Sequence, residues 1–165
     1  MLDIQLVRID DRLIHGQVAV VWTKETKVER ILVVSDEVAR DNLRKTLLQQ
    51  AAPPNIKAHV IPVDKLLDVN RDPRFAGVKT MLLFTNPHDV WRVVRQGLSL
   101  KTINIGGMKF TSGKKMITNF VSVDQQDVTD FQYLHDHGLD LEIRKVPADK
   151  KVDLMELLKK EKMLA

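Results

Sequence analysis

Short apolar runs alternate with amphipathic stretches along most of the chain. Residues 31–34 and 81–84 are unbroken apolar runs, which are typical of strands covered by helices on both faces of a sheet. The same pattern, followed along the chain, predicts seven strands, over residues 4–9, 30–34, 57–63, 80–85, 101–105, 117–123 and 139–146.

The stretches between these strands have the spacing of amphipathic helices. Ala39, Leu43, Leu47 and Ala51 recur every four residues and form one apolar stripe, which we expect to face the core. The pair at 86–87, Asn then Pro, supplies an N-cap and a first-turn proline for another helix. Helices are therefore predicted over residues 16–25, 39–51, 86–97 and 124–138, with a terminal helix over 154–162.

Regular alternation of strands and helices indicates right-handed crossovers and a mostly parallel sheet. The stretch 106–113 breaks this alternation, because no helix separates the strands on its two sides, and this favours an antiparallel hairpin at an edge. No linker or repeat divides the chain. The sequence therefore predicts one α/β domain over residues 1–165, with an open, mostly parallel sheet of about seven strands, helices on both faces and an antiparallel edge.

Composition narrows the possible functions. The chain has no cysteine, which excludes disulfides, Cys-ligated zinc, iron–sulfur clusters and thiol nucleophiles. No run reaches the roughly 18 apolar residues of a membrane span, and the N-terminal segment lacks the apolar core of a signal peptide, so we expect a cytoplasmic protein. The net charge of +4 is spread along the chain. Nucleic-acid-binding proteins concentrate positive charge on one face, so we expect no nucleic acid and instead a protein partner with an acidic surface.

The densest cluster of reactive side chains lies between the first predicted strand and the first predicted helix. Ligands of open α/β sheets bind outside the carboxyl ends of the strands, and residues 8–17 place two carboxylates, two arginines and a histidine there. A neutral imidazole is a nucleophile, and an arginine offers a planar fork of donors that fits phosphate oxygens. A helix N-terminus adds a binding site for anions. Together these groups suit a histidine that accepts a phosphoryl group.

A purely structural explanation of these residues is equally open at this point. Asp10 or Asp11 can cap a helix, Arg8 and Arg12 can form surface ion pairs, and His15 can be an ordinary loop histidine. Short motifs of this kind carry false positives. Composition and placement alone do not decide between the two explanations.

Other strand ends supply weaker candidates. The pair Gly106 and Gly107 favours a tight turn, and the alternative is that its backbone N–H groups face a phosphate carried by His15. Ser35 and Thr85 can donate hydrogen bonds to the same phosphate, although cap or turn roles are favoured for both. Neither glycine-rich phosphate-binding motif stands where it is expected, which argues against a nucleotide-binding enzyme.

The remaining histidines do not indicate a metal site. His135 and His137 are two residues apart in a predicted helix, so they do not share a face. We therefore expect no metal and no cofactor.

Residues 8–18, RIDDRLIHGQV, resemble the active-site signature of the IIB components of the bacterial sugar phosphotransferase system, mannose/fructose/sorbose family. The resemblance continues through ILVVSD at 31–36, MLLFTNP at 81–87 and NIGGM at 104–108. It covers essentially the whole chain and shows no departure within the first motif. It implies an open, mostly parallel sheet of seven strands with helices on both faces.

The resemblance also implies a phosphocarrier. His15 would be phosphorylated, at Nδ1, by a phosphohistidine of the IIA component, and the phosphoryl group would pass to a sugar delivered by the membrane components IIC and IID. Arg12 would neutralise the phosphoryl oxygens, and Asp10 would order the loop or the imidazole. Supporting or phosphate-binding residues would be Arg8, Asp11, Gly16, Gln17, Ser35, Thr85, Gly106 and Gly107.

Several features stay open or follow only from this resemblance. The chain has no room for a fused IIA domain, so IIA is expected to be a separate protein. The carrier is expected to associate peripherally with a membrane transporter. The sugar stays open between sorbose, mannose, fructose and related hexoses. The alternative to phosphotransfer is a non-catalytic binding or regulatory module on the same fold.

Overall fold

The computed structural model describes residues 1–164. Its strands are β1 (Asp3–Asp10), β2 (Arg30–Val34), β3 (Lys57–Ile61), β4 (Lys79–Phe84), β5 (Thr102–Gly107), β6 (Lys115–Thr118), β7 (Val121–Val123), β8 (Asp140–Ile143) and β9 (Val152–Asp153). Its helices are α1 (Gly16–Thr26), α2 (Asp36–Ala39), α3 (Asn42–Gln50), α4 (Leu66–Arg71), α5 (Pro87–Arg95), α6 (Gln125–Asp136) and α7 (Leu154–Lys160). Two short 3₁₀ turns flank α4, η1 (Val63–Lys65) and η2 (Pro73–Phe75).

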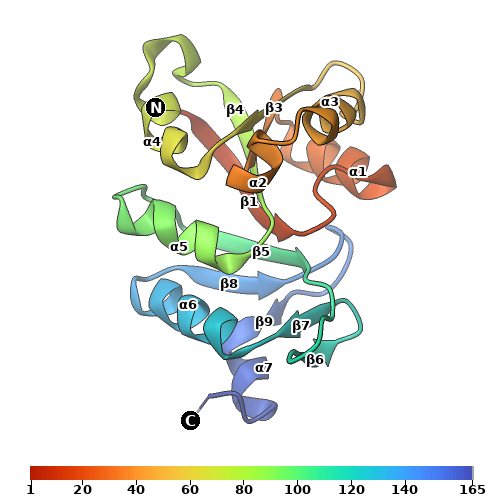
Figure 1. Cartoon of the computed structure of the whole chain (residues 1–165), viewed down its shortest axis with the longest axis vertical. Helices are drawn as coiled ribbons and strands as arrows, with labels where there is room; N and C mark the ends of the chain where they lie inside the picture. The colour runs from red at the N-terminus through yellow and green to blue at the C-terminus, as the bar shows by residue number, and fades with distance from the viewer. Residues whose placement is uncertain (165) are drawn as a thin grey trace.

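Seven of these strands form one sheet in the order β3-β2-β4-β1-β5-β8-β9 (Figure 1). Every neighbouring pair is parallel except β8 and β9, which are antiparallel. The strand order reverses around β1, which pairs with β4 on one side and with β5 on the other. The predicted fold class, a mostly parallel sheet with an antiparallel edge, is confirmed.

The location of the antiparallel strands differs from the prediction. Residues 117–123 do not form one strand beside the strand that precedes Gly106. The chain reverses between Thr118 and Val121, and β6 and β7 form a separate two-stranded antiparallel sheet. The hydroxyl of Thr118 accepts a hydrogen bond from the Phe120 N–H at 3.2 Å and stabilises the reversal. The seventh strand of the main sheet is β9, whose two residues, Val152 and Asp153, are too few to give a strand signal in the sequence.

Two hydrophobic cores cover the two faces of the sheet. One core contains Trp22 of α1, Val38 of α2 and Leu48 of α3. The other contains buried residues of α4, α5, α6 and α7. Figure 1 shows α5 and α6 running beside each other along this second face. The prediction of helices on both faces is therefore confirmed.

The prediction of one helix over residues 39–51 is wrong about where the helix begins and about which of its faces is buried. Two helices cover this region, because Asp41 accepts a hydrogen bond from the Arg44 N–H at 3.0 Å and caps a new helix, α3. The new start changes the direction in which each side chain points. Leu43 and Leu47 are 71% and 56% exposed, and Leu48 is the buried residue of α3.

Candidate active site

The loop between β1 and α1 places His15 at the carboxyl end of the central strand. The Leu13 N–H donates to the carbonyl oxygen of Asp10 at 2.9 Å, so the chain turns immediately after β1. Leu13 has a positive φ of 59° and is buried, which anchors the turn in the core. His15 is the extended residue just before α1. Its imidazole therefore lies beside both the strand end and the first turn of the helix.

Asp10 is the centre of the site, because its fully buried carboxylate contacts three basic side chains. One oxygen, Oδ2, lies 3.1 Å from Nη2 of Arg8 and 3.0 Å from Nε2 of His15. The other, Oδ1, accepts from the Arg12 backbone N–H at 3.1 Å and lies 3.4 Å from its Nε. A carboxylate in this position fixes the orientation of the imidazole.

The environment of Asp10 favours its ionised form. Burial raises the pKa of Asp10. The hydrogen bond from His15, the charge of Arg8 and the hydrogen bond from the Arg12 N–H together lower it by more than burial raises it. The net pKa of Asp10 therefore lies below the ordinary value of 3.8. An ionised carboxylate accepts hydrogen bonds and cannot donate one. In the neutral imidazole, Nε2 of His15 therefore carries the proton of this bond and Nδ1 keeps its lone pair.

Arg8 lies beneath this site and is 2% exposed. Burial lowers the pKa of Arg8 in spite of the opposing effect of Asp10. Its guanidinium donates to Oδ1 of Asn104 and, at 3.1 Å, to the carbonyl oxygen of Arg144. The indole ring of Trp22 lies 5.4 Å from the Arg8 guanidinium carbon. The explanation of Arg8 as a surface ion pair is therefore wrong.

Asn104, Arg144 and Trp22 are supporting residues that the sequence-based prediction did not include. Arg8 pairs with Asn104 in the β1–β5 register, and Asn104 donates through Nδ2 to the Arg144 carbonyl oxygen at 3.1 Å. Trp22 donates through Nε1 to the carbonyl oxygen of Lys145 at 2.9 Å. The position of Asn104 at a strand end was the only available signal, since strand order and register decide which side chains it meets.

Gly106 and Gly107 are the last two residues of β5, so the prediction that they form a tight turn is wrong. A Cβ atom on Gly106 would overlap the guanidinium of Arg8. A Cβ atom on Gly107 would lie 3.0 Å from Oδ1 of Asp10. Both glycines are explained by the close approach of β1 side chains to the β5 backbone.

Asp11, Arg12, Gly16 and Gln17 surround the buried centre. Asp11 accepts from the Lys109 N–H at 2.7 Å and links the loop to the residues after β5. The Arg12 side chain is 49% exposed. Gly16 has a φ of +45° and nothing near its Cβ position, and Gln17 is exposed at the start of α1. None of Asp10, Asp11 and Arg12 is the cap residue of α1, which is His15.

The family model described as "PTS system sorbose subfamily IIB component" matches residues 4–165. The chain belongs to this family. It is similar to a fructose-specific EIIB component of Bacillus subtilis, with 44% identity over 96% of this chain and 98% of the relative. The crystal structure of the IIBSor domain of the Klebsiella pneumoniae sorbose permease matches with a TM-score of 0.94 and 44% identity, over 97% of this chain and 98% of that chain.

A third relative is longer than this chain. The mannose-specific EIIAB component of Escherichia coli K12 is 55% identical over 95% of this chain, and the match covers 49% of the relative. The chain therefore spans about half the length of the first curated relatives it matches.

Two of the predicted phosphate-binding residues of this IIB family member make structural contacts. Ser35 is buried, and its hydroxyl accepts a hydrogen bond from the Val38 N–H at 3.3 Å as the cap of α2. The hydroxyl of Thr85 accepts from Nδ2 of Asn86 at 3.0 Å. The structure records no hydrogen bond from either hydroxyl to the Asp10–His15 cluster among residues 1–164. The cap or turn roles favoured for these two residues agree with these contacts.

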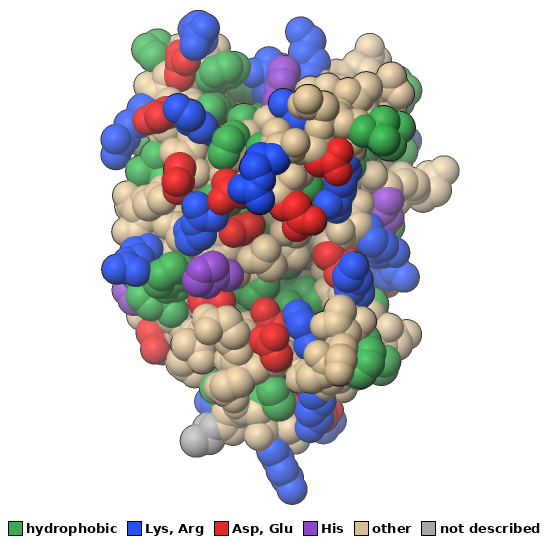
Figure 2. Space-filling view, viewed as in Figure 1, with side chains coloured by type: hydrophobic (Ala, Val, Ile, Leu, Met, Phe, Trp, Pro, Cys, Tyr) green, Lys and Arg blue, Asp and Glu red, His purple; other side chains and the backbone are tan. Residues whose placement is uncertain are grey.

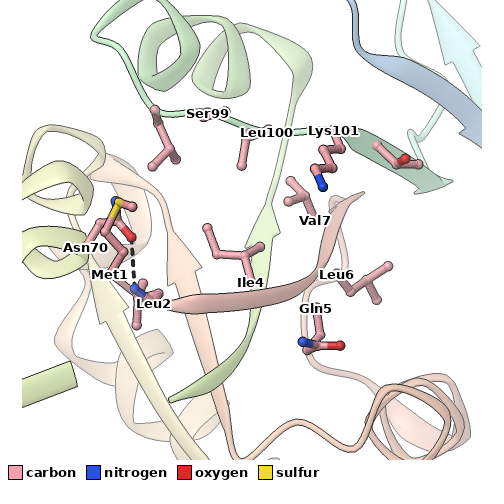
Figure 3. Close-up of a pocket in the computed structure, with 12 residues that line it drawn as sticks. Met1, Leu2, Ile4, Gln5, Leu6, Val7, Asn70, Ser99, Leu100 and Lys101 are labelled. Atoms are coloured by element: carbon pink, nitrogen blue, oxygen red, sulfur yellow. Dashed lines mark hydrogen bonds between the residues drawn. The ribbon is translucent and has the colours of Figure 1, made fainter. Parts of the chain in front are cut away.

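The imidazole of His15 is partly exposed and lies away from a cavity of about 420 Å³. This cavity lies at the opposite end of β1, where it is lined by Ile4, Val7 and Leu100 among others (Figure 3). His15 does not line it, and 23% of the imidazole is exposed. Basic and acidic side chains are interspersed over the face shown in Figure 2. None of the helices within residues 1–164 is long and apolar enough to cross a membrane.

A second histidine–carboxylate pair, His88 and Asp130, lies outside this site. Here it is Nδ1 of the histidine that lies 3.2 Å from the carboxylate. The ring of His88 stacks on Trp91 with a centroid distance of 4.8 Å. No group of three or more metal-ligating side chains occurs among the described residues.

Proposed function

We propose that this chain is a phosphocarrier that accepts a phosphoryl group on Nδ1 of His15 and passes it to a sugar. The observation that carries the proposal is the 3.0 Å contact between Nε2 of His15 and the buried carboxylate of Asp10. It leaves Nδ1 as the nucleophilic nitrogen and holds the ring in one tautomer.

In the first step, the Nδ1 lone pair attacks the phosphorus atom of a phosphohistidine on a IIA component. A new N–P bond forms, the donor N–P bond breaks, and its electron pair returns to the donor imidazole. The ring of His15 keeps the proton on Nε2 and becomes cationic in character. The negative charge of Asp10 stabilises that charge, as a carboxylate does for an imidazolium in other enzymes.

Charge on the phosphoryl oxygens is neutralised by groups at the rim of the site. The half-exposed guanidinium of Arg12 is near enough to the imidazole to turn toward a bound phosphoryl group, since both contact Asp10. The first N–H groups of α1 have no partner within the helix and add a partial positive charge. Arg8 is buried and paired, so its role is to hold Asp10 rather than to contact phosphate.

In the second step, a sugar hydroxyl attacks the phosphorus and an O–P bond forms. The N–P bond to His15 breaks, its electron pair returns to Nδ1, and the hydroxyl proton is released to solvent. The sugar is a hexose of the mannose, fructose and sorbose class, delivered by membrane components IIC and IID with which the chain associates peripherally. A partly exposed imidazole suits this sequence of events, because the loop must meet a donor protein and then an acceptor complex. Contacts of this type are small and transient.

The test is the intact mass of the purified protein after incubation with phosphoenolpyruvate and cell extract. We expect one added phosphoryl group on the wild type, removed by mild acid, and none on His15→Ala. His88→Ala is the matched control, because it removes the histidine of the other histidine–carboxylate pair; this variant should be phosphorylated like the wild type.

Two results would contradict the proposal. Phosphorylation of His15→Ala would assign the phosphate to another residue. Failure of the wild type to gain phosphate, under conditions that phosphorylate a control IIB protein, would favour the non-catalytic module. A ¹⁵N NMR spectrum of the phosphorylated imidazole distinguishes Nδ1 from Nε2 within the same sample.

A further inference from the structure

A second cavity, of about 300 Å³, lies at the β3 edge of the sheet, between α3 and the segment of α4 and η2. Its walls are largely apolar and include Leu32, Val60 and Phe75. Its polar lining consists of four side chains that donate hydrogen bonds, Arg30, Lys45, Gln49 and His59. Among residues 1–164, no side-chain carboxylate lines the cavity.

Arg30 differs from the other three donors because one of its nitrogen atoms, Nε, is buried and has no hydrogen-bond partner among the described residues. Its guanidinium carbon lies 5.1 Å from the centre of the Phe75 ring, so the charge rests against an apolar wall. Partial removal of a charge from water is costly unless an opposite charge compensates it.

Two positively charged side chains, Arg30 and Lys57, lie near His59. Burial lowers the pKa of His59, and the positive charges of Arg30 and Lys57 lower it further. The repulsion is built into the strand register, because Arg30 pairs with Lys57 in adjacent parallel strands. An anion in the cavity would relieve this repulsion and supply the partner that Arg30 lacks.

We infer that this cavity binds a small organic anion, in which a carboxylate or phosphate group is attached to an apolar body. The anionic group lies against Arg30 and Lys45, and the apolar body lies against Leu32 and Phe75. A volume of this size is at the lower end of that of small-molecule sites. A mixed lining of apolar walls with a few convergent donors is typical of such sites.

This site is separate from the phosphoryl site. Arg30 is the first residue of β2, whereas His15 follows the carboxyl end of β1. These strands are parallel and are separated by β4 in the sheet. The cavity therefore lies at the β3 edge of the sheet, whereas His15 lies beside the central strand, with β4 and β2 between them. Occupancy of one site can be measured without the other.

The test is a titration of ¹⁵N-labelled protein with phenyl phosphate and, separately, with benzoate, followed by amide chemical shifts. We expect saturable shifts at residues 30, 45, 49, 59 and 75 with at least one of the two compounds. Arg30→Gln should weaken that binding by about tenfold or more, because a charge-assisted hydrogen bond is lost. Arg74→Gln is the matched control, since Arg74 also faces the Phe75 ring but does not line the cavity.

Benzyl alcohol, which has no charge, tests the requirement for an anionic group. Inorganic phosphate, which has no apolar body, tests the role of the apolar walls. Equal binding of benzyl alcohol would remove the requirement for an anion, and equal binding of inorganic phosphate would remove the role of the apolar walls. The inference also fails if neither aromatic anion shifts the cavity residues, or if Arg74→Gln weakens binding as much as Arg30→Gln. Shifts confined to the loop around His15 would show binding at the phosphoryl site alone and would equally overturn it.

Discussion

Nε2 of His15 and Oδ2 of Asp10 lie 3.0 Å apart, with the carboxylate fully buried and the imidazole partly exposed. The buried partner is held in place by Arg8, which is itself enclosed. Arg8 and Asp10 are therefore both buried, and His15 is the partly exposed member of the three. A fixed base below an accessible ring suits a group that must be presented to two different partners.

We expect Asp10→Asn to slow phosphorylation of His15 by at least about a hundredfold. The Asn amide can donate to Nε2, which would move the ring proton to Nδ1 and remove the nucleophilic lone pair. The measurement is the rate of phosphoryl transfer by rapid quench and mass spectrometry. Asp11→Asn is the control, because Asp11 accepts from the Lys109 N–H, and no hydrogen bond or ion pair joins it to His15 among the described residues. An Asp10→Asn protein that is folded and transfers at the wild-type rate would remove this role.

The carboxylate of Asp10 also makes the free energy of unfolding depend on pH in the acidic range. Because the net pKa of Asp10 is below its ordinary value, the ionised form contributes stability that is fully present above the ordinary value and is lost as the pH falls through the lower, folded value. Between about pH 5 and pH 3, we expect the wild type to lose more of its free energy of unfolding than Asp10→Asn does. Urea denaturation at each pH measures this. Parallel losses in both proteins would contradict it.

Arg12→Gln separates activity from stability. The Arg12 side chain is 49% exposed and 3.4 Å from Asp10, so its loss should change the free energy of unfolding by less than about 0.5 kcal/mol. Phosphoryl transfer should slow by at least about tenfold, because a donor to the phosphoryl oxygens is lost. Arg74→Gln, which removes another exposed arginine paired with an aspartate, should leave transfer unchanged. A normal rate in folded Arg12→Gln would exclude a role for Arg12 in transfer.

The residues proposed to take part in phosphoryl transfer could be predicted because they are close together in the sequence. Asp10, Arg12 and His15 lie within six residues, between a strand and a helix that the hydrophobic pattern identifies. Asn104 and Arg144 could not be predicted in the same way. They are 96 and 136 residues away from Arg8, and only the order of β1, β5 and β8 brings them to it.

The errors in the predicted fold have a similar origin. A four-residue apolar spacing predicts one helix over 39–51, but the side chain of Asp41 caps a second helix and changes which leucine is buried. The strand β9 has only two residues, both exposed, and its pairing with β8 depends on where α7 packs. Local patterns therefore predict the alternation of elements, whereas caps and edge pairings depend on the assembled fold.

Gly106→Ala tests the close contact between β1 and β5. The new Cβ atom would overlap the Arg8 guanidinium, so we expect a loss of about 3 kcal/mol in the free energy of unfolding, at the upper end of the usual cost of overpacking. Gly107→Ala should cost less, because its Cβ would lie 3.0 Å from an Asp10 oxygen. Urea denaturation compares the two variants.

A double-mutant cycle of Gly106→Ala and Arg8→Met tests whether overlap with the Arg8 guanidinium causes the loss of stability in Gly106→Ala. Arg8→Met removes the overlapping guanidinium, so Gly106→Ala should cost much less in an Arg8→Met background than in the wild type. Arg8→Met alone leaves Asp10 without its buried partner and will itself be destabilising. Additive losses in the double variant would show that Gly106 is required for a reason other than its contact with Arg8.

Substitutions of the three leucines of α3 test which face of that helix is buried. Leu43→Ser and Leu47→Ser should each change the free energy of unfolding by less than about 0.5 kcal/mol, since both side chains are mostly exposed. Leu48→Ala should cost about 2 kcal/mol or more, because it leaves a cavity in the core beneath α3. A large loss for Leu43→Ser or Leu47→Ser together with a small loss for Leu48→Ala would restore the single helix that the sequence predicts. In such a helix Asp41 would lie inside the helix and would not cap it. Asp41→Ala would then cause no loss of stability, whereas removal of the observed cap of α3 should be destabilising.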